Sequence, residues 1–419
     1  MRLKAIAGLA AVFVLSSCGS DATAPPKPAS LVVSATGTLI GTVNAAVVPS
    51  PTFTVLDAKG VAISNVSVTI AVTSGGGTIA SAPKASGGGP IPVGAWVLGP
   101  TPATNTMTVT VAGLAPVVIT ATARPVYYVD LRFFGPPVDA AIQASFIAAK
   151  TRIESMIVGE VQDIPVNALE IANVCGAEGV APLTETIDDV LILATVKDID
   201  GVGKILGSTN QCYQRATGGL SLVSVMNFDV ADFQTLKADG RLNDVVLHEM
   251  LHAVGFGTLW ASKGQVSGAG TPASGFVGAQ AVAACQAAGG GANCAMTVPL
   301  EPCGGQGTRD VHWKESITCA GSSSTFGFRT EIMTGFVSAA GIANPLSRIT
   351  IASLADIGYQ VNVAVADNYT VPSGASAFAL TQIREAQGLG GFEISEIVRG
   401  PVAAVDANGR VTQNSARRE

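Results

Sequence analysis

The segment His248-Glu249-Met250-Leu251-His252 holds residue types whose spacing suits metal chemistry. Residues four apart lie on one face of an α-helix, so both histidine side chains point the same way and one cation can lie between them. Glu249 directly follows the first histidine, where its carboxylate can reach a water molecule on that cation. Zinc lowers the pKa of such a water and the glutamate accepts its proton, so the pattern indicates metal-assisted peptide hydrolysis.

A pattern with three fixed letters also occurs by chance, and a hydrogen-bonded pair of helix histidines is the structural alternative. The histidine count changes this balance, because the whole chain has 3 histidines and two of them lie in the pattern. Catalytic zinc usually takes three protein ligands and leaves one position for water, so we predict that His312 is the third ligand. A carboxylate from Glu301 or Glu331 is the alternative.

The helix that carries the pattern is expected to run from Leu242 to Val254. Gly255 ends it, since glycine permits the left-handed conformation that turns the chain sharply. The turn is needed because the chain must return to the ion, and the offset to His312 is 312 minus 255, or 57 residues. A loop of that length with little periodic structure has to be tied down.

The first residues have the composition of a targeting segment followed by a tether. Two basic residues precede an apolar run from Ala5 to Leu15, which fits a signal peptide and is too short to span a bilayer. Small residues before Cys18 are typical of a bacterial lipobox, with an ordinary secretory signal as the alternative. We predict a signal peptide over 1–17, an extended tether over 18–28, and an exported lipoprotein held at the outer membrane or cell surface by lipid on Cys18.

Export places the remaining cysteines in an oxidising compartment, where an even six favours three disulfides. A cysteine zinc site is the alternative, but the chain has no C-x-x-C pair to support it. Connectivity does not follow from sequence, and pairing of neighbours is the simplest choice. The predicted pairs are Cys175 with Cys212, Cys285 with Cys294, and Cys303 with Cys319. The last two pairs would tie the long segment before His312.

Length and composition limit the fold and the partners. At 419 residues the chain is expected to form two or three domains. Few aromatic residues and abundant glycine favour β-rich modules with long loops over a helical bundle. A net charge of -6 without a basic stripe argues against a nucleic-acid partner.

Residues 29–124 are predicted to form a β-sandwich. Residues 66–73 and 106–111 alternate β-branched apolar residues with serine and threonine, as strands buried on one face do. The stretch, including Thr73-Ser74-Gly75-Gly76-Gly77-Thr78 and Trp96-Val97-Leu98-Gly99, resembles the bacterial immunoglobulin-like domains of invasin-type surface proteins. Without histidines or a carboxylate cluster, it is interpreted as a spacer rather than a ligand-binding module.

The region after residue 124 is predicted to alternate strands and helices. Residues 128–133 form a first strand, a helix of about four turns with inward residues from Ile142 to Ile153 follows, and apolar strands come at 190–196 and 220–228. Strand, helix and strand in this order make an α/β unit.

The motifs around the histidines resemble those of the leishmanolysin family of metzincin zinc endopeptidases. The shared features are His248-Glu249-x-x-His252-x-x-Gly255, an insertion, His312-Trp313, and a methionine turn at Met333. Thr258 stands where the compact metzincin pattern has its third histidine, and the long insertion is itself a leishmanolysin trait. The resemblance covers residues 126–361.

The resemblance implies a site and an activity. His248, His252 and His312 would bind one catalytic Zn²⁺, Glu249 would be the general base, and Met333 would form the apolar floor. The expected protein is multidomain, with an all-β immunoglobulin-like sandwich followed by an α+β metzincin-type protease domain that carries a disulfide-bearing insertion. Its partners would be protein or peptide substrates.

A surface adhesin or binding protein with a non-catalytic zinc domain is the alternative function. Residues 362–419 are interpreted as a tail without an assigned role. Within it, 377–385 is a candidate short helix and Asn408-Gly409 is a hairpin signal.

Overall fold

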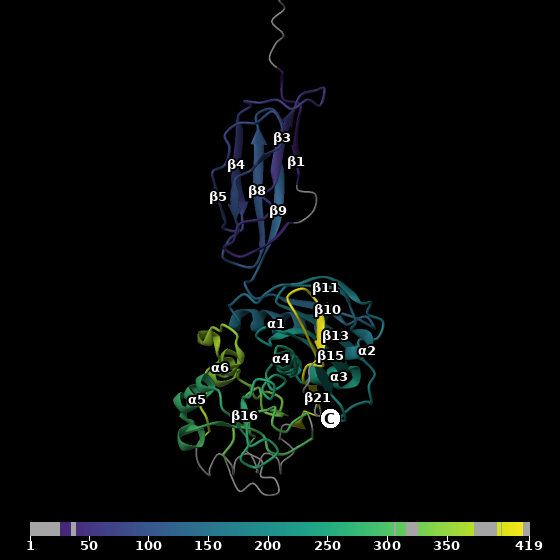
Figure 1. Ribbon diagram of the computed structural model, residues 1–419, viewed down its shortest axis with the longest axis vertical. Coiled ribbons are helices and arrows are strands. Elements are labelled where there is room, and N and C mark those ends of the chain that lie inside the picture. Colours follow the sequence, from purple (N-terminus) through teal and green to yellow (C-terminus); the bar gives the residue numbers. More distant parts are fainter. Residues whose placement is uncertain are drawn as a thin grey trace, which may run out of the picture. The chain divides into compact units, whose positions relative to one another are not determined.

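The computed structural model describes residues 26–34, 39–305, 307–315, 326–372, 392–394 and 396–413. The predicted signal peptide, Cys18, the candidate helix at 377–385 and Cys319 lie outside these residues. The chain divides into two compact units, the first ending at Ala123 and the second beginning at Arg124 (Figure 1). Within the described ranges, no helix has the length and apolar character needed to cross a membrane.

The first unit consists of strands on a shared core. The predicted strands at 66–73 and 106–111 correspond to β4 and β8, which pair antiparallel. Phe53, Trp96 and Met107 are fully buried at its centre. The all-β prediction is confirmed for the described residues, while the immunoglobulin-like assignment stays a prediction. The strands are β1 Ser30–Val33, β2 Leu39–Thr42, β3 Thr52–Leu56, β4 Val68–Ser74, β5 Thr78–Ala80, β6 Ile91–Pro92, β7 Ala95–Val97, β8 Thr104–Val111 and β9 Val117–Arg124, in sheets ordered β1-β3-β6, β2-β9-β8-β4 and β5-β7.

The first half of the second unit alternates strands and helices, as predicted. The apolar runs at 190–196 and 220–228 are central strands, and the histidine-bearing helix runs from Leu242 to Ala253. The elements are β10 Val129–Phe133, α1 Ala140–Met156, β11 Ile164–Leu169, α2 Ala172–Cys175, β12 Leu183–Ile187, β13 Val190–Lys197, β14 Gly207–Arg215, β15 Ser221–Asp229, α3 Val230–Ala238 and α4 Leu242–Ala253. The sequence did not indicate β14, because its run of polar residues gives no apolar pattern.

The second half consists of short elements joined by long connections. Its longest helix, α6, ends at Gly358 in a left-handed conformation. The elements are β16 Val266–Ser267, β17 Gly275–Phe276, α5 Ala279–Cys285, η1 Gln286–Gly290, η2 Gly291–Cys294, β18 Val298–Pro299, β19 Phe336–Val337, α6 Arg348–Ile357, η3 Val363–Val365, β20 Phe392–Glu393, β21 Glu396–Arg399, β22 Ala403–Val405 and β23 Val411–Gln413.

The second unit contains a 7-stranded mixed sheet. Its order is β10-β13-β15-β14-β22-β23, and β21 also pairs with β14. Strands β10, β13 and β15 are parallel to one another, and β14 is antiparallel to β15. The sheet is therefore of mixed α/β character.

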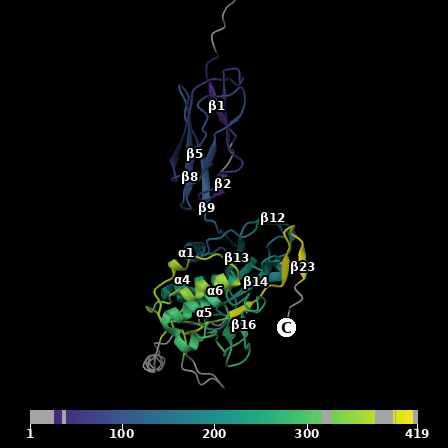
Figure 2. The same cartoon turned by 60° about the vertical axis from the view of Figure 1, so that its left-hand side comes forward.

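The sheet has an apolar core on each face. Along β13, Ile192 and Ala194 belong to one core, which includes residues of α1, α4 and α6, while Leu191 and Leu193 belong to the other, which includes residues of β11 and β12. Burial on both faces explains the nearly continuous apolar sequence of β13. Helix α1 packs against α4, and α5 packs against α6 (Figure 2).

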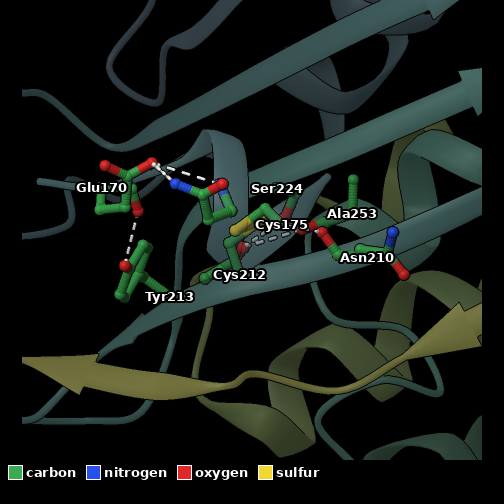
Figure 3. Close-up of a disulfide and its surroundings, with 9 residues drawn as sticks. Glu170, Cys175, Asn210, Cys212, Tyr213, Ser224 and Ala253 are labelled. Atoms are coloured by element: carbon green, nitrogen blue, oxygen red, sulfur yellow. Dashed lines mark hydrogen bonds between the residues drawn. A yellow bond between two sulfur atoms is a disulfide. The ribbon is translucent and has the colours of Figure 1, made fainter. Parts of the chain in front are cut away.

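Two of the three predicted disulfides are present, and the third involves Cys319, outside the described residues. Cys175 of α2 is bonded to Cys212 of β14 (Figure 3), and Cys285 is bonded to Cys294 within the long segment before His312. Next to the first disulfide, the Tyr213 hydroxyl donates to the carbonyl of Glu170 at 2.7 Å. The Cys175–Cys212 disulfide and the hydrogen bond of Tyr213 hold β14 to the segment that contains α2.

The segment interpreted as a tail extends the sheet instead. Strands β21 and β22 both pair in parallel with β14, and β23 pairs antiparallel with β22. The hairpin signal at Asn408-Gly409 is confirmed, with Gly409 at φ 78° between β22 and β23. The physical reason is that β14 would otherwise present unpaired backbone groups along one side.

Candidate metal centre

Helix α4 presents both histidines of the motif on one face. His248 and His252 are buried, and their ring centroids lie 4.8 Å apart. The helix is fixed to the sheet at its end, because Ser221 and Ser224 of β15 both donate to the carbonyl of Ala253, at 2.8 and 2.7 Å (Figure 3). The predicted turn follows, with Gly255 at φ 122°. A side chain there would collide with Leu259 and Ile357, so glycine is required.

The chain returns from this turn and brings His312 to the same point. The Nε2 atom of His312 lies 3.0 Å from Nε2 of His248 and 2.9 Å from Nε2 of His252. The two helix histidines have their Nε2 atoms 3.1 Å apart. The three histidines of the chain therefore meet in one buried cluster.

Backbone carbonyls determine which nitrogen of each ring faces the cluster. The Nδ1 atoms of His248, His252 and His312 donate to the carbonyls of Ile332, Phe256 and Thr308, at 2.7, 2.8 and 3.1 Å. A carbonyl only accepts hydrogen bonds, so each neutral ring carries its proton on Nδ1 and turns an Nε2 lone pair inward. Three lone pairs this close repel one another unless a cation lies between them, and imidazole nitrogen is a preferred zinc donor.

Burial supports the neutral form of His252. It lowers the pKa of His252 well below its usual value, and the neighbouring imidazoles add to this effect. A neutral imidazole is the form that binds a metal ion. The donor set present therefore fits a zinc ion.

Glu249 lies beside the cluster, next to the Glu396 carboxylate. Its Oε2 accepts a hydrogen bond from the Thr209 hydroxyl of β14 at 2.5 Å. Its Oε1 is buried and has no hydrogen-bond partner among the described residues. Burial, followed by the neighbouring Glu396 carboxylate, raises the pKa of Glu249 well above its usual value. A buried carboxylate oxygen without a donor is suited to accept a proton from a bound water.

Glu396 of β21 is a member of the cluster that sequence reasoning missed. Its Oε1 lies 2.8 Å from Nε2 of His312 and 3.4 Å from Nε2 of His248. Its separation from His248 is 148 residues, which no local motif spans. The alternating run Phe392-Glu393-Ile394-Ser395-Glu396-Ile397-Val398 was the only available signal, and it indicates a strand rather than a ligand.

The two carboxylates considered as alternative third ligands accept hydrogen bonds from other parts of the chain. Glu301 accepts hydrogen bonds from the backbone amides of Cys303 and Glu315, at 3.1 and 2.8 Å. Glu331 accepts from the Met333 amide at 2.6 Å and from the Thr350 hydroxyl at 2.6 Å. Among the described residues, the buried group able to hold a metal consists of the three histidines and Glu396.

Met333 lies in the segment that supports the histidines. It is fully buried, and its carbonyl accepts a hydrogen bond at 3.0 Å from the amide of Trp313, the residue after His312. The preceding carbonyl, that of Ile332, accepts from His248. The methionine turn thus joins two of the three histidines through its backbone, while a floor role for its side chain stays a prediction.

Glu331 is expected to stabilise this turn strongly. Besides Met333 and Thr350, it binds the amide and hydroxyl of Ser347, so its carboxylate accepts four hydrogen bonds in the interior. Glu331→Gln replaces an acceptor by a donor and leaves buried groups unpaired, at a cost of about 2 to 3 kcal/mol in the free energy of unfolding. Urea denaturation measures this loss. The exposed Glu178→Gln is the control and should shift stability by less than about 0.5 kcal/mol; equal effects of the two variants would refute the assignment.

Comparisons with known proteins agree with the arrangement of the histidines. The family model described as leishmanolysin, Peptidase M8, matches residues 148–382. No curated protein matches this chain. Among solved structures, the chain is similar to a Bacteroides ovatus GH5 xyloglucanase in complex with a XXXG heptasaccharide, at 13% identity and a TM-score of 0.19, covering 54% of this chain and 50% of that chain. The chain thus spans about half of that enzyme's length, and so low a TM-score does not indicate a shared fold.

Proposed function

This chain belongs to the leishmanolysin family of metallopeptidases, and from that premise we propose that it is a zinc-dependent endopeptidase that cleaves proteins or peptides. The observation that carries the proposal is the cluster of three inward Nε2 atoms, 2.9 to 3.1 Å apart, beside the unpartnered oxygen of Glu249. His248, His252 and His312 would hold the ion.

The roles of the side chains follow from their positions. When bound, zinc supplies a Lewis acid that makes a water molecule acidic and polarises the peptide carbonyl. Glu249 accepts a proton from the attacking water on its free Oε1 and passes it to the leaving nitrogen. The Thr209 hydroxyl holds the other carboxylate oxygen, so Glu249 stays oriented during the transfer. The carbonyls of Ile332, Phe256 and Thr308 keep the histidine nitrogens directed inward.

The rest of the chain would place the peptidase outside the cell. In this proposal residues 1–17 are a signal peptide, lipid on Cys18 anchors the protein in a bacterial membrane, and the immunoglobulin-like residues 29–124 act as a spacer. Support comes from the composition of the first residues and from the separate compact unit that ends at Ala123. The two disulfides agree with an oxidising compartment.

Zinc content and chelation test the proposal. Elemental analysis is expected to find one zinc per chain, a readout that does not depend on access of a substrate. Cleavage of a casein-type substrate should stop with 1,10-phenanthroline and return when zinc is added. Protein that takes up no zinc would refute the metal site, and cleavage that persists after the metal is removed would refute the mechanism.

A surface adhesin with a non-catalytic zinc domain is the competing function. A site that only stabilises the fold has no use for a buried carboxylate with a free oxygen beside its ligands, because such a group costs stability. This observation favours the peptidase.

A further inference from the structure

Glu396 lies against the same histidine nitrogens that would hold the metal. Its side chain is fully buried, with Oε1 at 2.8 Å from His312 Nε2 and Oε2 at 3.8 Å from His252 Nε2. The shorter of these separations is similar to the 2.9 to 3.1 Å between the imidazole nitrogens, and the other is longer. Catalytic zinc sites keep three protein ligands and one exchangeable position, whereas sites closed by four protein ligands are structural. A carboxylate at this place closes the site.

Short strands on either side of Glu396 are paired with other parts of the second unit. Before Glu396, β20 pairs with β19, and the Ile394 amide donates to the Gly335 carbonyl at 2.9 Å. From Glu396 onward, β21 pairs with β14 on the other side, from Gly207↔Glu396 to Asn210↔Arg399. Extended peptides bind to exposed sheet edges in this manner. Strand β21 therefore occupies an edge of β14 that an extended peptide could otherwise pair with.

Neighbouring backbone lies close to Glu396. A Cβ atom on Gly307 would lie 2.0 Å from the Glu396 carbonyl oxygen, so the loop that leads to His312 lies directly against β21. Strand β14, which pairs with β21, is also paired with β15.

Residues after β21 anchor the segment to the sheet. The Val402 amide donates to the Cys212 carbonyl at 3.0 Å, and Ala403 and Val405 belong to one of the two cores of the second unit. The segment is therefore an integral part of the fold, and its position over the histidines is reinforced from its C-terminal side.

We propose that β21, continued by β22 and β23, forms an intramolecular inhibitor in which Glu396 takes the fourth ligand position and β21 takes the place of the substrate backbone. The inference rests on the proposed zinc peptidase function. The full chain is then a latent enzyme, and cleavage within this segment or its displacement from β14 opens the site to proteins.

Glu396→Ala tests the proposal, with Arg399→Ala as the matched control on an exposed position of the same strand. The full chain and both variants are loaded with zinc, and three quantities are measured: zinc per chain, binding of acetohydroxamate by calorimetry, and cleavage of casein. We expect all three proteins to hold one zinc. Glu396→Ala should bind acetohydroxamate at least tenfold more tightly than the full chain, while Arg399→Ala should match the full chain.

The hydroxamate result separates this proposal from the peptidase assignment. Tighter binding by Glu396→Ala would support closure by Glu396 whether or not casein is cleaved, because the backbone of β21 remains paired with β14 in this variant. Equal hydroxamate binding in the variant and the full chain, or loss of zinc from Glu396→Ala, would refute the inhibitor role. Glu396→Gln, which keeps the shape of the side chain, is the second variant and should shift binding in the same direction if Glu396→Ala does not fold.

Discussion

Glu249→Gln is expected to retain its zinc and to lose its peptidase activity, with kcat lower by about a hundredfold or more. The amide keeps the size of the carboxylate but cannot accept the proton of the attacking water. Glu249 lies outside the group of four possible ligands, so the metal should not depend on it. The contact with Thr209 at 2.5 Å can persist with an amide oxygen, so the fold should be preserved.

The measurement compares casein cleavage and zinc content in Glu249→Gln and in the protein without this change. Both should be measured with and without Glu396→Ala, so that a closed site cannot hide the effect. Glu178→Gln, at an exposed position, is the control for a glutamate-to-glutamine change as such. Cleavage at the full rate in Glu249→Gln would show that another group is the base.

His312→Ala is expected to weaken zinc binding by about a hundredfold or more. Even groups that only orient a metal ligand contribute about ten- to a hundredfold to metal affinity. Its Nε2 lies 2.9 and 3.0 Å from the other two, and removing it leaves two imidazoles for the ion. A dialysis series against buffered zinc measures the affinity. An unchanged ratio of metal to protein would remove His312 from the ligand set.

Glu396 is the group that can replace His312, because its carboxylate lies 2.8 Å from the His312 nitrogen. The double variant His312→Ala with Glu396→Ala is therefore required. If it binds zinc much more weakly than His312→Ala alone, Glu396 acts as a ligand when a histidine is missing. If the two bind zinc equally, Glu396 does not compensate.

Much of the fold could be predicted because apolar patterns are local. The continuous apolar run of β13 and the inward residues of α1 indicated their elements, and both were found. Strand β14 was missed, although it carries Thr209 and Cys212, because its burial depends on β15, β21 and β22 packing beside it. A polar run such as this one becomes a central strand only through partners that are distant in the chain.

The sequence by itself determined the pairing of His248, Glu249 and His252, since helical geometry places residues four apart on one face whatever surrounds them. It also indicated His312, by the count of histidines and by the resemblance of His312-Trp313 to the leishmanolysin motif. The tertiary structure alone decided that the 57 residues after Gly255 fold back so that His312 meets the helix, and that Glu396 arrives at the same point. The physical reason is that the positions of His312 and Glu396 depend on strand pairing and hydrogen bonds between distant segments. These segments are 60 to 148 residues apart, and no local spacing encodes such contacts.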